Sequence, residues 1–534
     1  MEELAKVSPG ELADGASPSW RRRNIARRAP QNFDRESRKA YRPGAAGTGS
    51  ACWSVAMKSL RKTVLELLEH PRAPHFILLV GLLLRIGLLI FLGNRPFEGD
   101  AGSYHEIALQ WAAGTPFEPD WPPGVPSLLI IAYKIFGSSP IVARVVMLPV
   151  YVAFCAVVTA LGKRIGGVRV ANFALAVFAV TPIFIWTSVN PLTPLPSAAL
   201  ALGAVLFADR CRTGTHVLRD SLMLGLCLAG LLLTRPSNIA MVGALPVYLL
   251  WRRARWQVVA IPVVVVALLT GAWCLKCYRM TGRPVFINNA NSQNIFYGNN
   301  PYTPLYHTWW YGSHKMPGEM TPEFEGLFKQ ILKADMKERD RLYVKTATDH
   351  IKARPDLFLL RTVNRVRVFF GFDTFTSAQL AKESRLAGTL TLAADAGLYV
   401  WLCLLALLFP AVVLSRAKGW EGLMASARAA SEGQAGGLEA WRSNLKRRIE
   451  MLLLVALLYA FPYFFAFSHP TFHVPMTALV GMIGAFAGVA LLETGIVAIW
   501  SGLGSWPRRW TVVAVVAFLL IQVEWGVALV HRVV

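Results

Sequence analysis

Long apolar runs, separated by short polar stretches, dominate the chain after residue 72. The runs are continuous rather than alternating, which favours helices over the strands of a barrel, and several approach the roughly 20 residues that a bilayer requires. The pattern therefore predicts an all-α polytopic membrane protein. We expect about eleven spans, at about 76–92, 141–161, 170–189, 193–208, 218–233, 237–250, 257–275, 395–414, 451–467, 473–495 and 510–531.

Basic residues gather in alternate loops, such as "GKRIGGVR", "WRRARW" and "WPRRW". Because Lys and Arg favour the cytoplasmic side, the pattern predicts a multi-pass plasma (inner) membrane protein with its N-terminus in the cytoplasm and its C-terminus outside. The formal net charge of +23 is explained by these loops and by contact with membrane lipids, so we predict no nucleic-acid partner. We predict that residues 1–72 form a disordered basic cytoplasmic tail and that residues 73–534 form a multi-span transmembrane domain.

Two loops on the predicted outer face, about 93–140 and 276–394, are unusually rich in polar and aromatic residues. In the first, Tyr104, Ile107, Ala108 and Trp111 recur at helical spacing and predict an interfacial helix. "PSLLIIAYKIFG" (126–137) is too short to span, so we expect a second helix buried at the interface or against the bundle.

Asp100 precedes this interfacial helix and has two interpretations. It could cap the helix, or it could be a general base at headgroup depth that accepts a proton from an acceptor hydroxyl. Asp120 and Glu106 are the reserve acids. Asp120 stands beside Trp121 and a Pro-Pro-Gly turn, whereas Glu106 is expected to face solvent.

The first outer loop, with "GDAGSYHEIALQWAAGTPF" and "WPPGVPSLLIIAYKIFG", resembles that of superfamily C glycosyltransferases. It is most similar to glycosyltransferase family 39, the protein O-mannosyltransferases, and to bacterial relatives including the aminoarabinose transferases of lipid A. Those proteins carry an Asp after the first span, a Tyr four residues later, a Gly before an aromatic residue and a Pro-Pro-Gly before a membrane helix. The matching positions occur in the same order: Asp100, Tyr104, Gly114, Phe117 and Pro122-Pro123-Gly124.

Three later stretches extend the resemblance over about residues 76–375: "GLLLTRPSNIA", "CLKCYRMTGRPVFINNANSQNIFYGNNPYT" and "DRLYVKTATDHIKARPDLFLLRTVNRVRVFF". The chain departs from relatives at Ala101, which often is Glu, at Pro194, where many have a Glu, and at Thr471, which begins Thr-Phe-His instead of Arg-Tyr-Arg. The resemblance implies the superfamily C fold. It also implies transfer of a sugar, with inversion, from a polyprenyl-phosphate donor to an extracytoplasmic lipid, glycan or protein acceptor.

A lipid-phosphate donor requires cations at the membrane surface. Lys276 and Arg279 follow a predicted span, and Arg235 lies between two short ones, so we assign all three to the donor phosphate. The alternative for each is interfacial snorkelling. The remaining candidate substrate ligands are Tyr104, Asn299, Asn300 and His473. The two asparagines lie in a Gly-Asn-Asn-Pro sequence that is equally explained by turn chemistry.

His469 and His473 are four residues apart, but a metal site would need further ligands, such as His307 and His314. We predict neither a required cofactor nor a metal site. Glu493 and Glu524 lie in late predicted spans, where a proton-coupled lipid or solute transporter would use such groups. A transporter is thus the alternative function, although the sequence shows no inverted repeat. A non-catalytic scaffold of the same fold is the third.

Overall fold

The computed structural model describes residues 48–115, 118–214, 216–305, 321–415, 437–466 and 468–533. Within these ranges the chain is helical and contains no strand. The chain divides into two compact units, Met1–Lys58 and Ser59–Val534. The first helix, α1 (Thr48–Glu69), covers the end of the predicted tail. The tail before residue 48 lies outside the described residues.

The helices of the first half vary in length. They are α2 (Ala73–Leu92), α3 (Asp100–Ala112), α4 (Gly124–Phe136), α5 (Pro140–Val180), α6 (Pro182–Thr187), α7 (Pro194–Thr213), α8 (Val217–Thr234), η2 (Pro236–Asn238), α9 (Ile239–Trp251) and α10 (Gln257–Thr281). The second half contains α11 (Ala290–Gly298), α12 (Pro322–Lys333), α13 (Met336–Ala353), α14 (Pro355–Phe370), α15 (Phe375–Ala381), α16 (Arg385–Leu414), α18 (Gly437–Phe465), η4 (Pro470–His473), α19 (Val474–Thr494), α20 (Ile496–Ser501) and α21 (Ser505–Val533).

Eight helical segments of the described chain are long and apolar enough to cross a membrane. One of them, α5, has 41 residues and is interrupted by non-helical angles at Gly166 and Gly167, which accounts for two predicted spans. The predicted spans 193–208 and 237–250 fall on α7 and α9, which are not among the eight. The predicted polytopic all-α class is confirmed.

The core of the second unit is built around α19, the most buried of the eight segments. Gly481, Gly484 and Gly488 lie on the side of α19 that meets its neighbours. A Cβ at Gly484 would lie 2.7 Å from the backbone oxygen of Leu402 in α16. Small residues therefore let these helices approach closely, which is how membrane helices gain packing energy.

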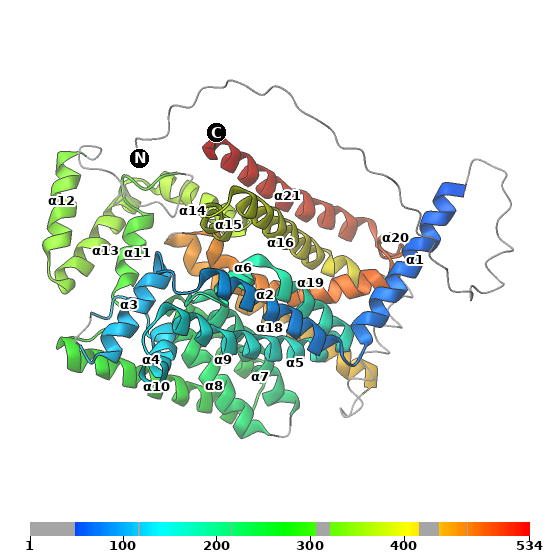
Figure 1. Cartoon of the computed structure of the whole chain (residues 1–534), viewed down its shortest axis with the longest axis horizontal. Helices are drawn as coiled ribbons and strands as arrows, with labels where there is room; N and C mark the ends of the chain where they lie inside the picture. The colour runs from blue at the N-terminus through cyan, green and yellow to red at the C-terminus, as the bar shows by residue number, and fades with distance from the viewer. Residues whose placement is uncertain are drawn as a thin grey trace, which may run out of the picture. The chain divides into compact units, whose positions relative to one another are not determined.

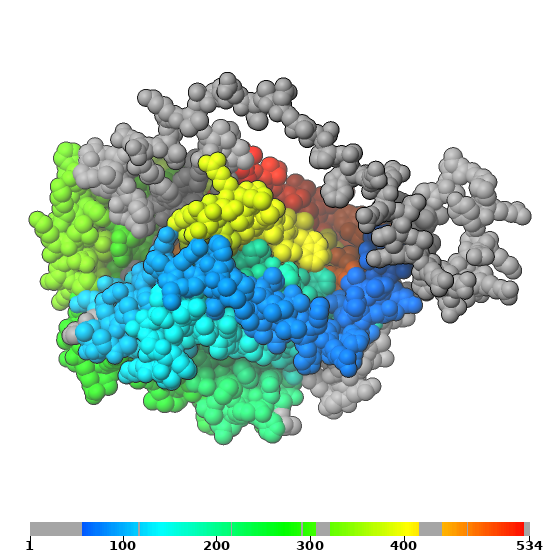
Figure 2. Space-filling view, viewed as in Figure 1, coloured from blue at the N-terminus to red at the C-terminus, as the bar shows by residue number. Residues whose placement is uncertain are grey.

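The charge inside the first span, Arg85, is satisfied by packing. Its Nη1 donates to the carbonyl oxygens of Gly81 and Ala179, at 2.8 and 2.9 Å, and its guanidinium lies 3.4 Å from the ring centroid of Tyr151. The side chain is fully buried. The expectation of a packing residue is confirmed. In Figure 2, α2 (blue) runs along the surface between α16 (yellow) and α4 (cyan).

The two loops predicted to face outward fold into helices that meet at one end of the second unit (Figure 1). The predicted interfacial helix is α3, whose Tyr104, Ile107 and Ala108 are buried, and the predicted second helix is α4. The two loops are joined directly. The backbone nitrogen of Asn289 donates to Pro119 O at 3.0 Å, and Arg283 pairs with Glu118 at 2.7 Å. This end of the unit carries the candidate chemistry.

Candidate functional site

Asp100 begins α3 immediately after Gly99, whose φ of 57° is a conformation that glycine adopts without strain. The N-cap makes no side-chain hydrogen bond, and the Asp100 carboxylate accepts none from a described residue. The capping interpretation is therefore wrong. Water reaches the Asp100 side chain, which is exposed.

Arg235 is the cation that acts on Asp100. Burial raises the pKa of the Asp100 carboxyl above its ordinary value, and the positive charge of Arg235 opposes that rise. Protein atoms therefore crowd a carboxylate that water still reaches, so the group remains able to ionise. The Arg235 charge acts on Tyr104 as well, one turn along α3. Tyr104 is buried and packs edge-on against Trp121, with ring centroids 5.2 Å apart.

Arg235 is held by side chains from three other parts of the chain. Its Nε donates to Thr193 Oγ1 at 2.8 Å, and its Nη1 donates to the hydroxyls of Tyr459 and Tyr463 at 3.2 and 2.6 Å. The guanidinium also lies 4.9 Å from the ring centroid of Phe472. Free interfacial snorkelling is therefore wrong for this residue, because four side chains fix the plane of the guanidinium.

Those contacts use three of the five N–H donors of Arg235. Nη2 donates to no described residue, and Arg235 is only partly buried. The two N–H groups left on Nη2 of this fixed guanidinium can donate charge-assisted hydrogen bonds to phosphate oxygens. The arrangement thus places an ionisable carboxylate within the electrostatic reach of a cation that still has donors to offer.

His469 lies beside this cation. Burial, together with the charge of Arg235, lowers the pKa of His469 to about 4, so the ring is neutral at pH 7. Its Nδ1 accepts from the backbone nitrogen of Thr471 at 3.2 Å. The hydroxyl of Tyr459 donates to the carbonyl of Phe472 at 2.9 Å, which ties the same segment to α18.

Lys276 occupies a different position. Its Nζ lies 4.0 Å from the ring centroid of Trp111 and 5.6 Å from that of Trp273. Trp111 is eleven residues after Asp100, which is about 16 Å of helix rise. Lys276 therefore does not lie at the Asp100 end of α3, and the structure does not bring it together with Arg235. Arg279, one turn later on α10, is exposed.

The two reserve acids are both exposed. Asp120 Oδ1 accepts from Asn289 Nδ2 at 3.3 Å, and its carbonyl accepts from Asn288 at the same distance. Glu106 faces outward, as expected, and accepts from Gln110 at 3.4 Å. Asp120 thus helps to join the two outer loops, while neither acid has the cationic partner that Asp100 has.

Asn299 and Asn300 are buried and occupied by protein groups. The Asn299 amide donates to the carbonyls of Ile295 and Phe465, and its oxygen accepts from Arg365 at 2.9 Å. Asn300 donates to Phe296 O and accepts from the Tyr302 backbone. These contacts favour the turn interpretation, in which the two amides anchor the chain, and the assignment to a substrate stays a prediction.

His473 is also buried. Its Nδ1 is 3.0 Å from the carbonyl of Phe369, so that nitrogen carries the proton, and its ring stacks on Tyr399 with centroids 4.5 Å apart. In the described part of the chain no three His, Cys, Asp or Glu side chains form a metal-holding group. His307, His314 and the motif residue Phe117 lie outside the described residues.

Sequence reasoning missed Thr193, Tyr459, Tyr463 and His469 as parts of the site. The two tyrosines are four residues apart, one helical turn, within the apolar run "LLYAFPYFF". That spacing was the available signal, but an apolar run is normally interpreted as lipid-facing or core. Only the packing of α18 against η2 and α9, the two elements that follow Arg235, shows that both hydroxyls meet this guanidinium.

No protein-family model matches the sequence, and no curated protein matches it. Solved structures show a distant likeness. A crystal structure of ArnT from Cupriavidus metallidurans in the apo state is 15% identical, with 79% of this chain and 77% of that chain covered and a TM-score of 0.35. The same protein bound to undecaprenyl phosphate has a TM-score of 0.37 at the same identity and coverage.

A crystal structure of the Archaeoglobus fulgidus oligosaccharyltransferase in the apo form is 14% identical. The likeness covers 84% of this chain and 55% of that chain, with a TM-score of 0.42. Identities and TM-scores at this level carry no argument about activity.

Proposed function

We propose that this membrane protein is a glycosyltransferase that moves a sugar from a polyprenyl-phosphate donor to an extracytoplasmic lipid, glycan or protein acceptor. The observation that carries the proposal is the pair of Asp100 and Arg235. The carboxylate is exposed and lacks a hydrogen-bond partner among the described residues, and the neighbouring guanidinium has one nitrogen, Nη2, without a described acceptor.

In the proposed reaction Asp100 accepts the proton of the acceptor hydroxyl as its oxygen attacks the anomeric carbon of the sugar. The bond from that carbon to the phosphate oxygen breaks, and the electron pair leaves with the polyprenyl phosphate. Nη2 of Arg235 donates to the phosphate, where negative charge develops. Attack opposite to the leaving group inverts the anomeric centre.

The positions of the two groups suit a lipid-linked donor. Asp100 lies eight residues after the end of α2, and Arg235 directly follows α8, so both lie at the ends of membrane-crossing helices. A phosphate at the membrane surface could reach both groups while its polyprenyl chain remained in lipid. Trp121 is partly exposed and is held by the buried ring of Tyr104, so it offers an aromatic surface on which a sugar ring can pack.

No specific observation favours the transporter. Glu493 pairs with Arg169 at 2.7 Å, and Glu524 pairs with Arg367. Both acids therefore have basic partners. Such ion pairs explain the acids as structural groups without a role in proton coupling. A glycosyltransferase must transfer a sugar to an acceptor, whereas a transporter or a scaffold would not.

The test is an assay with purified protein in lipid nanodiscs, a panel of radiolabelled polyprenyl-phosphate sugars and a membrane extract as the source of acceptors. Transfer of label should occur with the wild type and disappear in Asp100→Asn. Glu106→Gln is the matched control, because it removes a carboxylate from the same helix on its exposed side. No transfer from any donor in the panel, or equal transfer by both variants, would refute the proposal.

A further inference from the structure

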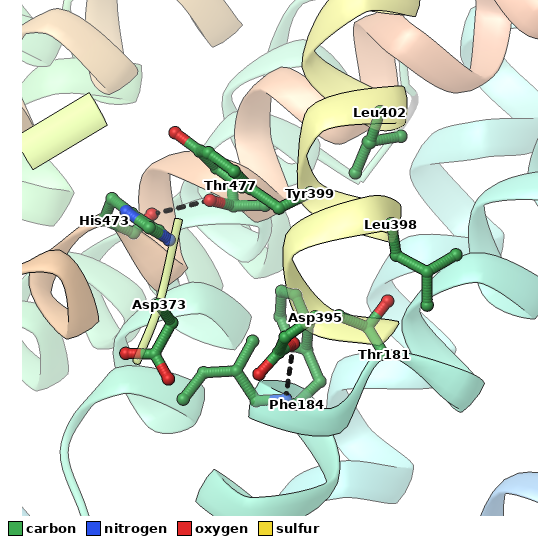
Figure 3. A pocket seen from close by; sticks show the side chains of 10 residues that line it. Thr181, Phe184, Asp373, Asp395, Leu398, Tyr399, Leu402, His473 and Thr477 are labelled. Carbon is green, nitrogen blue, oxygen red and sulfur yellow. Dashed lines mark hydrogen bonds between the residues drawn. The ribbon is translucent and has the colours of Figure 1, made fainter. Parts of the chain in front are cut away.

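A second cluster of acids lies away from Asp100, in a small cavity among α6, α16, η4, α19 and the loop after α14. Figure 3 shows Asp395 projecting from α16 toward the side of the cavity where Asp373 and His473 lie. The cavity has a volume of about 10 Å³, about the space that one water molecule needs. Its other walls include Thr181, Phe184, Tyr399 and Thr477.

Both carboxyl groups are almost fully buried, with 2% of each residue exposed. Asp395 Oδ1 accepts from the backbone nitrogen of Ile183 at 3.0 Å, but its Oδ2 has no hydrogen-bond partner in the described chain. Asp373 accepts from the backbone nitrogen of Thr376 at 3.1 Å and from Thr471 Oγ1 at 2.9 Å. Neither acid forms an ion pair with a described Lys, Arg or His.

Two ionised carboxylates in one dry cavity would repel each other, and no nearby cation would compensate them. The other titratable groups that face the cavity are His473 and Tyr399, with Cys403 behind Tyr399. The Nδ1 of His473 donates to Phe369 O, and no described ion pair joins the His473 ring to either acid. Burial raises the pKa of Asp373, although the two hydrogen bonds oppose the rise.

We propose that Asp373 and Asp395 form a proton-binding site that holds at least one proton at neutral pH, shared across the cavity directly or through one water. The carboxyl that carries the proton is neutral, and its O–H donates to the other. This proton supplies the partner that Asp395 Oδ2 lacks. It also removes the uncompensated charge from the cavity.

The proton-binding site also reaches the candidate active site. Asp373 holds Thr471, and the same short segment carries His469 and Phe472 against Arg235. The shared proton therefore helps to position this segment. That consequence rests on the proposed function, whereas the presence of the proton does not.

The test is difference infrared spectroscopy of the full chain in nanodiscs, in H₂O and D₂O at neutral pH. The wild type should show the carbonyl stretching band of a protonated carboxyl that shifts in D₂O. Asp395→Asn should remove that band. Asp349→Asn is the matched control and should leave it, since Asp349 is exposed and the bonded Lys345 lowers its pKa. If Asp395→Asn does not fold, Asp373→Asn replaces it.

A second measurement follows the thermal midpoint against pH. A carboxyl with a raised folded-state pKa binds more protons when folded, so stability falls as pH rises through the interval above the ordinary value near 3.8. The midpoint of the wild type should fall with rising pH, and Asp395→Asn should flatten that dependence. A band that survives in both variants overturns the proton-binding site. A midpoint that depends on sodium concentration, with no band, also overturns it. The band decides this question even if no sugar transfer is ever detected.

Discussion

Asp100 begins α3 and Asp395 lies inside α16, and the protein surrounds these two acids in opposite ways. Asp100 is exposed and lies under the charge of Arg235, while Asp395 is buried and pairs with another acid. A carboxylate that exchanges protons with a substrate needs water and a balancing cation. A carboxyl that maintains structure needs neither, provided that it stays protonated. The surroundings, rather than the residue type, separate a candidate base from a structural acid.

The sharpest test of that comparison makes the same Asp→Asn substitution at Asp100 and at Asp395. Asp100→Asn should lower turnover at least about 10²-fold, the usual contribution of a positioned general base, and leave the thermal midpoint nearly unchanged. Asp395→Asn should leave turnover within about twofold, since a neutral amide resembles the protonated acid. Turnover and thermal midpoint should be measured on both variants. Full activity in Asp100→Asn would remove the distinction.

The pH dependence of the rate gives the next effect. The base form of Asp100 is lost as pH falls through its pKa, which burial raises above 3.8, so the rate should fall about tenfold per pH unit on the acid side. His469 has a pKa of about 4, so its ring is neutral above pH 4 and its titration does not change the rate in that range. A pH–rate profile of the wild type and of Asp100→Asn checks this, because the residual rate of the variant should lack the acid limb.

Arg235→Lys should reduce turnover by about 10- to 100-fold. Lys keeps the charge but cannot bond Thr193 and the tyrosines and still present a second nitrogen to a phosphate. One lost hydrogen bond to a charged group is worth about 1.5–3 kcal/mol, which corresponds to that range. The variant should be compared at saturating donor. Arg341→Lys, an exposed position on α13, is the control and should be unaffected.

Asn299→Ala should destabilise the protein by about 1–3 kcal/mol, because Arg365 and two carbonyl oxygens lose a buried partner. Turnover per folded molecule should be unchanged, since this amide does not face a substrate. Denaturation in detergent and active-site titration separate the two quantities. A tenfold loss of turnover at full stability would restore Asn299 as a ligand.

The smallest effect is expected at Lys276. Its ammonium group lies over Trp111, far along α3 from Asp100, and a cation–π contact at an exposed site is worth about 0.5–1 kcal/mol. Lys276→Gln should therefore change turnover less than about threefold. Steady-state rates at several donor concentrations check this. A large rise in the donor KM would place Lys276 back on the phosphate.

Some elements of the fold could be predicted because they depend on local pattern. The apolar runs marked the membrane helices, and the spacing of Tyr104, Ile107 and Ala108 marked α3 together with its buried face. The count of spans was less secure. Gly166 and Gly167 break α5 without ending it, and a hydropathy pattern does not distinguish a kinked helix from two helices.

The candidate site was only half visible. Asp100 and Arg235 stood out because each lies in a stretch, "GDAGSYHEIALQWAAGTPF" or "GLLLTRPSNIA", that resembles the glycosyltransferase sequences. Tyr459 and Tyr463 did not, since their rings fit an apolar helix and their hydroxyls gain meaning only from a partner 224 and 228 residues away. The protein contacts of Asn299 and Asn300 were hidden for the same reason, because a Gly-Asn-Asn-Pro sequence presents the same residues whether its amides face solvent or the protein interior.

The sequence by itself determined that this protein lies in a membrane, where most of its helices are and which two loops carry polar groups. Hydrophobicity and helical period are local properties that can be read over short distances along the chain. Only the tertiary structure decided which polar groups meet. Arg235 differs from the exposed cations because three hydroxyl groups hold its guanidinium. Asp373 and Asp395, 22 residues apart in the sequence, line the same cavity because the loop after α14 folds back on α16. Contacts between distant segments depend on the packing of whole helices, which no local pattern encodes.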